Sequence, residues 1–195
     1  TCDFDPEPST LPAEFTRMCK EHGAYLAVVD KDDNKYTYRQ YYEQSMRFAK
    51  SCIKMGMDPE SVVGSIGFNS AEYFFAIQGT WLAGCVPAGI YTTNSPEACH
   101  YVLYHSEAQI CLCQGGKNAE KIASIRESLP KLKAIIVYWP KDGVPKVEEK
   151  PGLAKVMTWD QWMDVGKDVS DSVVRERVAN VKPGNCATLI YTSGT

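Results

Sequence analysis

Between residues 61 and 138 the sequence alternates short apolar runs with longer segments of helical periodicity. The apolar runs are SVVGSIGF at 61–68, CVPAGI at 85–90, AQICLCQ at 108–114 and KAIIVY at 133–138. Runs that are apolar at nearly every position are typical of strands covered on both faces, as in a parallel sheet between helices. The alternation therefore predicts an α/β fold, with a mostly parallel sheet flanked by helices.

The segments between these strands begin with good helix caps. Asn69 is predicted to cap a helix that runs to Ala83, and Ser95 a helix that reaches about residue 106. Residues 118–129 have helical periodicity as well. The most apolar stretch, residues 73–90, approaches the length of a membrane span but is broken by Gln, Gly and Pro. We interpret it as a buried helix that leads into a buried strand.

The first 56 residues lack this alternation. Residues 12–21 have a helical pattern, and residues 24–38 read as a hairpin. Thr37 and Gln40 have the spacing of a capping box, which predicts a helix that starts there and ends at Gly56.

After residue 138 the composition changes. Residues 139–152 are rich in Pro, Lys, Asp and Glu, and we interpret them as a surface loop within the domain, because the strand pattern resumes beyond them. Thr158 and Gln161 form a second capping box for a short helix to about Val165. Residues 186–191 read as a buried strand that leads into an exposed loop. The parallel sheet is thus expected to contain strands at about 62–66, 85–90, 109–114, 134–138 and 186–191.

Charge and cysteine usage narrow the class of protein. Lys and Arg number 21 against 24 Asp and Glu, a net charge of -3, so no basic surplus is available for a nucleic-acid partner. The eight cysteines are scattered, mostly at positions that look buried, which indicates reduced thiols, without structural disulfides or zinc, in a cytosolic setting. Cys111 and Cys113 have no second pair at zinc-ligand spacing, and we expect them to share one face of a strand.

No catalytic triad or carboxylate pair is evident. His22, His100 and His105 lie on or beside predicted helices without partners at useful spacing, so we interpret them as structural or exposed. Trp81 and the aromatic run at 73–75 could form a lipid-facing patch, but their helical spacing favours packing in the core.

The last predicted strand leads into four residues that suit an anion. Hydroxyl and backbone N–H groups of Thr192, Ser193, Gly194 and Thr195 can converge on a phosphate, and the glycine permits close approach. The pattern alone also fits an ordinary surface turn. It lacks the spacing of a Walker loop, and GSIGFNS at 64–70 lacks that of a dinucleotide fingerprint.

A family resemblance favours the phosphate loop. LIYTSGT at 189–195 resembles the opening of the phosphate-binding motif of the adenylate-forming superfamily, which includes acyl-CoA synthetases, luciferases and the adenylation domains of peptide synthetases. Residues 35–91 resemble the family's first helix, first parallel strand and following helix, and residues 103–114 its next helix-to-strand crossing. Residues 67–110 are most similar to long-chain fatty acyl-CoA synthetases of the bubblegum type.

The resemblance implies a function for a longer enzyme. Such a ligase uses ATP, Mg²⁺ and coenzyme A to convert a long-chain fatty acid to an acyl-adenylate and then to its thioester. A carboxyl group with a pKa of about 4 is already ionised at neutral pH, so the first step needs no strong general base. By resemblance, Thr192, Ser193, Gly194 and Thr195 would contact the β- and γ-phosphates, and no catalytic residue or metal ligand is assigned within the chain.

The resemblance also implies that residues 1–195 are a partial AMP-binding N-terminal domain, cut within the phosphate loop. The family places the loop lysine, the adenine and Mg²⁺ contacts, the fatty-acid tunnel and the lid lysine after Thr195. We expect the fragment alone to be inactive and the protein to be cytoplasmic, with peripheral contact to membranes left open. Two alternatives remain: an adenylate former for another carboxylic acid, or a non-catalytic truncated product that acts by binding.

Overall fold

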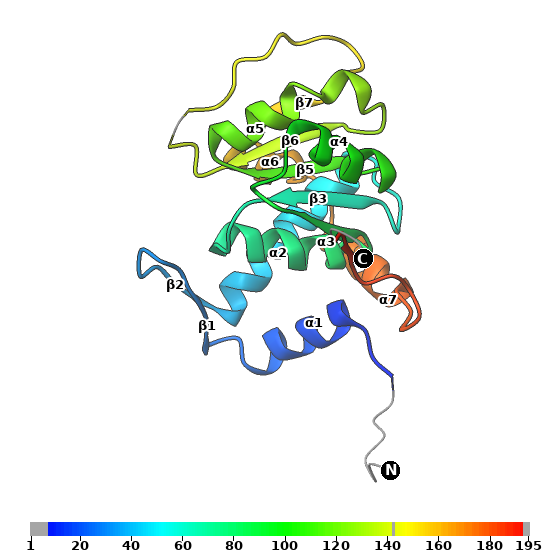
Figure 1. The fold of residues 1–195 in the computed structure, drawn as a ribbon. Helices are drawn as coiled ribbons and strands as arrows, with labels where there is room; N and C mark the ends of the chain where they lie inside the picture. The colour runs from blue at the N-terminus through cyan, green and yellow to red at the C-terminus, as the bar shows by residue number, and fades with distance from the viewer. Residues whose placement is uncertain (1–7, 142, 193–195) are drawn as a thin grey trace.

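A computed structural model describes residues 8–141 and 143–192. Six strands form its main sheet: β3 Val62–Ile66, β4 Val86–Ile90, β5 Ile110–Gln114, β6 Ala134–Tyr138, β7 Lys155–Thr158 and β8 Leu189–Ile190. Their order is β7-β6-β5-β3-β4-β8, and each neighbouring pair is parallel (Figure 1). The predicted parallel sheet and α/β class are confirmed.

Seven α-helices and one short 3₁₀ helix are described. They are α1 Leu11–Glu21, α2 Tyr38–Lys54, α3 Ala71–Leu82, α4 Pro96–His105, α5 Gly115–Ala123, the 3₁₀ helix η1 Arg126–Ser128, α6 Trp159–Val165 and α7 Asp171–Asn180. No described helix has the length and apolar character needed to cross a bilayer. The stretch at 73–90 is, as expected, a helix followed by a strand.

The helices form layers on both faces of the sheet. Buried side chains of α1, α2, α3, α6 and α7 form one core with one face of the sheet, and those of α4 and α5 form a second core on the opposite face. Figure 1 shows α2 and α3 below the sheet and α4 and α5 above it. Side chains alternate between the two faces along each strand, so adjacent Ile135 and Ile136 are both fully buried but belong to different cores.

The predicted hairpin is present outside the main sheet. Strands β1 Leu26–Val29 and β2 Lys35–Thr37 pair in antiparallel fashion. Asp30 organises the turn, because its Oδ1 accepts hydrogen bonds from the backbone N–H groups of Asp32 and Asn34, each at 2.9 Å. The hairpin leads directly into α2.

Helix α2 begins and ends as its sequence predicts. The Thr37 hydroxyl and the Gln40 side chain form a reciprocal capping box, and Gly56, at a φ of 69°, follows the last turn. Helix α3 packs closely against α2 at Gly79. A Cβ atom there would lie 2.7 Å from both the Phe48 Cβ atom and the Ser45 carbonyl oxygen.

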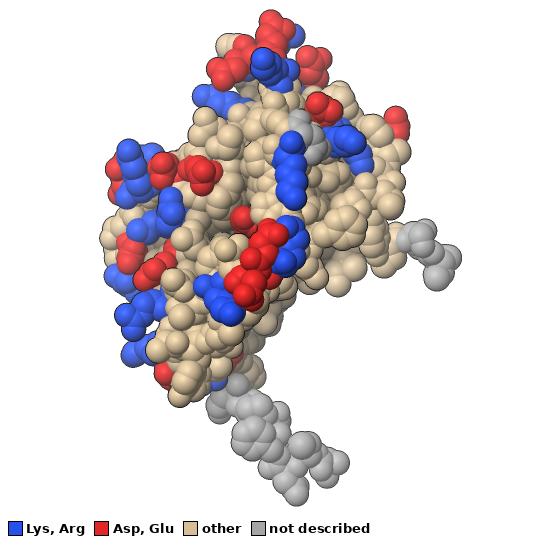
Figure 2. All heavy atoms as spheres, turned by 90° about the vertical axis from the view of Figure 1, so that its left-hand side faces the viewer, with Lys and Arg blue, Asp and Glu red and all other residues tan. Residues whose placement is uncertain are grey.

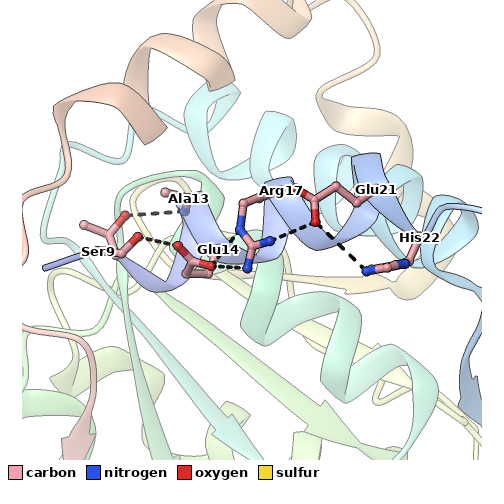
Figure 3. Close-up of polar contacts among 7 residues, drawn as sticks. Ser9, Ala13, Glu14, Arg17, Glu21 and His22 are labelled. Carbon is pink, nitrogen blue, oxygen red and sulfur yellow. Dashed lines mark hydrogen bonds and ion pairs between the residues drawn. The ribbon is translucent and has the colours of Figure 1, made fainter. Parts of the chain in front are cut away.

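Helix α1 carries a row of exposed polar contacts (Figure 3). The Arg17 guanidinium lies between the carboxylates of Glu14 and Glu21, 2.8 Å from each, and the Ser9 hydroxyl donates to Glu14 at 2.7 Å. The hydrogen bond from Ser9, followed by that from Arg17, lowers the pKa of Glu14. The buried face of α1 consists of Pro12, Phe15 and Cys19, which joins the helix to the core.

Three boundaries differ from the sequence predictions. Ser70, rather than Asn69, is the N-cap of α3, and its hydroxyl accepts from the Tyr73 N–H at 3.1 Å. Helix α5 begins at Gly115, three residues before the expected start, and Asn118 instead donates to the Gln114 carbonyl at 2.8 Å. The chain then turns into η1, so the expected single helix over 118–129 is wrong.

The prediction of a buried strand over residues 186–191 is wrong. Strand β8 has two residues, Leu189 and Ile190, and the Ile190 side chain is 78% exposed. Cys186 is exposed as well. The physical reason is position, because β8 is the edge strand of the described sheet and pairs only with β4.

The cysteines follow the expected burial pattern with one exception. Of the seven described cysteines, all free thiols, six are buried and Cys186 is exposed. The Cys111 and Cys113 sulfur atoms are 3.8 Å apart, so the two side chains share one face of β5. Among residues 8–141 and 143–192, no cluster of three His, Cys, Asp or Glu side chains could hold a metal.

Charges of both signs are mixed on the surface. Figure 2 shows the face that lies to the left in Figure 1, where acidic and basic side chains are interspersed among uncharged areas. Some of these charges form ion pairs between helices. The Lys50 ammonium nitrogen lies 2.6 Å from a carboxylate oxygen of Asp171, and this ion pair joins α2 to α7.

Candidate functional site

The loops that follow β3 and β4 lie at the carboxyl ends of these two paired, parallel strands. The helix after β3 covers one face of the sheet, and the helix after β4 covers the other. Open α/β sheets commonly bind ligands beyond the carboxyl ends of their strands. Strand β8 lies beside β4, so Thr192 leaves the sheet at this same edge. Ser193, Gly194 and Thr195 lie outside the described residues, and the phosphate contacts expected of all four stay a prediction.

An open groove of about 540 Å³ runs along β4 and β8 beside α3. Its wall on the helix side includes Tyr73 and Trp81, and its far end is formed by the loops that follow β3 and β4. No described residue that lines it is charged. The groove can therefore position a ligand by shape and hydrogen bonding, but its described lining offers no acid, base or cation.

The loop after β3 is fixed by the neighbouring strands. The Phe68 N–H donates to the Gln114 side-chain oxygen at 2.8 Å, and the Tyr138 hydroxyl donates to the Phe68 carbonyl at 3.3 Å. Only glycine fits at Gly67, because a Cβ atom there would collide with the Tyr138 hydroxyl and lie 2.7 Å from the Gln114 Cβ atom. Burial raises the pKa of Tyr138 well above its usual range, so its hydroxyl remains a donor at neutral pH.

The loop after β4 is held by Lys121. Its ammonium group, on α5, donates to the carbonyl oxygens of Thr92 at 2.9 Å and Asn94 at 2.8 Å. No pattern in the sequence indicates this role, since a lysine on the polar side of a helix looks like any solvated charge.

The chain is tethered just before β8. The Trp81 indole N–H donates to the Ala187 carbonyl at 2.6 Å, and the Thr188 hydroxyl donates to the Pro87 carbonyl at 3.0 Å. These two hydrogen bonds hold Ala187 and Thr188, the residues before β8, against α3 and β4.

Just beyond β8, Tyr191 contacts the last residue of α4. The Tyr191 hydroxyl lies 2.9 Å from Nδ1 of His105. Burial raises the pKa of Tyr191, an effect that a hydrogen bond with the Ser106 side chain partly offsets. The interpretation of His105 as a structural or exposed residue missed this contact with the chain beside the candidate loop.

The other sequence candidates lie elsewhere. His22 is near Glu21, and Nε2 of His100 is 3.4 Å from the Ser128 carbonyl oxygen. The aromatic run on α3 is divided: Phe75 is buried in the core as expected, whereas Phe74 is 43% exposed.

Comparison with known proteins identifies relatives of the chain. The family of AMP-binding enzymes matches residues 15–195. The long-chain-fatty-acid–CoA ligase ACSBG2 of Xenopus laevis is 44% identical over 191 residues, which cover 96% of this chain and 25% of that protein. The human ligase ACSBG1 is 36% identical over 199 residues, with 98% and 26% covered. These relatives confirm the resemblance to the bubblegum type, and the chain spans about a quarter of their length.

Solved structures agree on the fold. Coronafacic acid ligase from Pectobacterium brasiliense superposes with a TM-score of 0.74 at 16% identity, over 92% of this chain and 33% of that one. MbtA of Mycobacterium smegmatis gives a TM-score of 0.72 at 18% identity, over 97% and 32%. At such identities the likeness concerns the fold alone. The match over residues 15–195 shows that the chain belongs to the family of AMP-binding enzymes, and the fold agrees with it.

Proposed function

We propose that this chain is the N-terminal part of the AMP-binding domain of a long-chain fatty-acid–CoA ligase. The observation that carries the proposal is the 44% identity to a long-chain-fatty-acid–CoA ligase along nearly the whole chain. The position of Thr192, at the carboxyl end of a parallel strand beside an uncharged groove, supports it further.

The proposed reaction has two steps. A carboxylate oxygen of the fatty acid attacks the α-phosphorus of ATP, the bond from that phosphorus to the bridging oxygen breaks, and pyrophosphate leaves. The thiolate of coenzyme A then attacks the acyl carbonyl carbon, and the bond to AMP breaks. Since the carboxylate is already ionised, catalysis of the first step depends on positioning and on stabilising the charge of the leaving group.

This chain would contribute to the first step as a scaffold. The sheet presents Thr192 at its carboxyl edge, and the hydroxyl and N–H groups of residues 192–195 would contact the departing phosphates. Mg²⁺ would enter with ATP. The described residues include no cluster suited to a metal, so we assign them no metal-holding role. The remaining cationic and acyl-binding groups would belong to other parts of the protein.

The test is a substrate panel on the longer protein that carries this sequence. Purified protein is incubated with ATP, Mg²⁺ and hydroxylamine, which traps acyl-adenylates as hydroxamates, and with palmitate, benzoate or single amino acids. We expect trapping with palmitate, and thioester when coenzyme A replaces hydroxylamine. Trapping only with benzoate or an amino acid would favour an adenylate former for another acid. No trapping with any acid would favour a non-catalytic binding protein.

A further inference from the structure

The backbone pairing of β8 ends just before the candidate phosphate loop. Leu189 and Ile190 pair with Ala88 and Gly89, and Ile190 is largely exposed. The tethers from Trp81 and Thr188 act on the residues before β8. A two-residue edge strand orders its neighbours only weakly, so the direction in which the chain leaves the sheet depends on side-chain contacts after Ile190.

Tyr191 provides such a contact. Its ring meets the His105 ring edge-on, with centroids 5.8 Å apart at 90°, and its hydroxyl is 2.9 Å from Nδ1 of that histidine. Tyr101, one turn earlier on α4, stacks on His105 at 5.5 Å and meets Tyr191 edge-on at 6.3 Å. The Tyr191 side chain also packs against the core formed by α4 and α5. Three rings thus join the end of α4 to the residue that precedes Thr192.

We propose that His105 is a positioning residue for the ATP-phosphate loop: it holds Tyr191 and thereby sets the course of the chain through Thr192. The proposal rests on the proposed function, because only a nucleotide-binding loop makes this course relevant to a reaction. His105 touches no reacting atom. Its effect is to reduce the number of conformations of Tyr191 and Thr192 before ATP binds, which lowers the entropic cost of binding.

The test compares four variants of the full-length enzyme. His105→Leu removes the hydrogen bond and the ring, Tyr191→Phe removes only the hydroxyl, and His105→Asn places a polar amide where Nδ1 lies. His100→Leu is the matched control, since His100 is on the same helix but contacts Ser128 and Tyr104. We expect the KM for ATP to rise about fivefold in His105→Leu and Tyr191→Phe, the effect typical of one lost hydrogen bond.

The KM for coenzyme A and the KM values for ATP of the other variants distinguish a positioning role from a general loss of structure. The KM for coenzyme A should stay unchanged, His105→Asn should return the KM for ATP to within about twofold of wild type, and His100→Leu should match wild type. Hydrogen exchange on the same full-length enzyme without ATP gives a readout independent of activity, and the peptide 186–192 should exchange faster in His105→Leu.

The possible outcomes distinguish the His105–Tyr191 contact, the positioning role and the proposed function from one another. Faster exchange with an unchanged KM for ATP would mean that the contact is only structural, which contradicts the positioning role. Unchanged exchange would contradict the contact itself. A wild-type enzyme without ATP-dependent ligase activity would overturn the proposed function, and the positioning role with it. If His105→Leu does not fold, Tyr191→Phe carries the test, because it deletes a single oxygen atom.

Discussion

A single side chain, Lys121, joins α5 to the loop at the candidate site. Its ammonium group donates hydrogen bonds to two loop carbonyl oxygens, those of Thr92 and Asn94. We predict that Lys121→Met, which keeps the length of the side chain but removes the charge, lowers the free energy of unfolding by about 1–3 kcal/mol. Urea unfolding measures the change. Lys131→Met, at an exposed lysine before β6, is the control and should stay within about 0.5 kcal/mol of wild type.

The buried thiols predict how stability depends on pH. Burial raises the pKa of Cys19 and of Cys99 to about 11, from a usual value of 9.0. Unfolding exposes these thiols, which then lose their protons at lower pH than in the native state. The stabilisation is therefore complete below about pH 9 and is lost as the pH rises towards 11.

Urea unfolding in the presence of reductant at several pH values from 7 to 11 tests this dependence. The free energy of unfolding should be steady to about pH 9 and should then fall. In Cys99→Ala the fall should be shallower, because one of the contributing groups is gone. Stability that rises between pH 9 and 11 would show that the thiols are not buried as described.

At this scale the sequence predicted only part of the site. Thr192 is a candidate from sequence because its neighbours form a continuous motif, and its phosphate contact stays a prediction. Lys121 and His105 were not, since their partners are 27 and 86 positions away and the pairings arise only when the sheet brings α4, α5 and β8 together. Gly67 shows the same limit, because the side chains that exclude a Cβ atom come from β5 and β6.

At the scale of elements, the sequence predicts a helix start or a strand reliably when the signal lies within a few neighbouring residues. Both predicted capping boxes, at Thr37 and at Thr158, are formed. The four apolar strands between residues 61 and 138 were also found, because burial on both faces leaves an unmistakable run of apolar residues.

Elements near the edges of the molecule were missed or misjudged. Helix α7 buries only Val174, so its sequence has little amphipathic pattern. Strand β7 is an edge strand of four residues, none of them fully buried. Strand β8 looked longer than it is because apolar residues are expected to be buried, whereas an edge strand can leave them exposed. The burial of these elements depends on residues far away in the sequence, so a local pattern does not predict it.

The contact between α2 and α3 yields a prediction at the same scale. Gly79→Ala would press a methyl group against Phe48 and a backbone oxygen, both 2.7 Å from the new atom. Because backbone cannot move aside easily, we expect a loss of about 1–3 kcal/mol in the free energy of unfolding. Gly184→Ala is the control, since nothing lies within 4 Å of a Cβ atom there. Equal stability of the two variants would mean that the helices are further apart than described.

At the scale of the whole molecule, the buried centre of the sheet and its β4–β8 edge have different roles. Helices on both faces make the central strands rigid, while the groove, Tyr191 and Thr192 gather at the edge formed by β4 and β8. This arrangement places Thr192, the first residue of the proposed phosphate loop, at the carboxyl edge of the sheet. It also explains why the groove looks unreactive, since the described residues around it supply shape and hydrogen bonds but no charge.

We propose that this chain supplies the opening of the phosphate loop of a fatty-acid-activating enzyme and that the charged groups of the site lie outside it. The most direct measurement is palmitate-dependent exchange of pyrophosphate into ATP, run side by side on the full-length protein and on soluble, monomeric 195-residue chain. Loss of even one preorganised donor at a charged transition state costs about 3–4 kcal/mol, and several would be missing from the chain. We predict exchange that requires palmitate in the full-length protein and none above background in the chain. Robust exchange by the chain alone, or none by the full-length protein, would contradict this proposal.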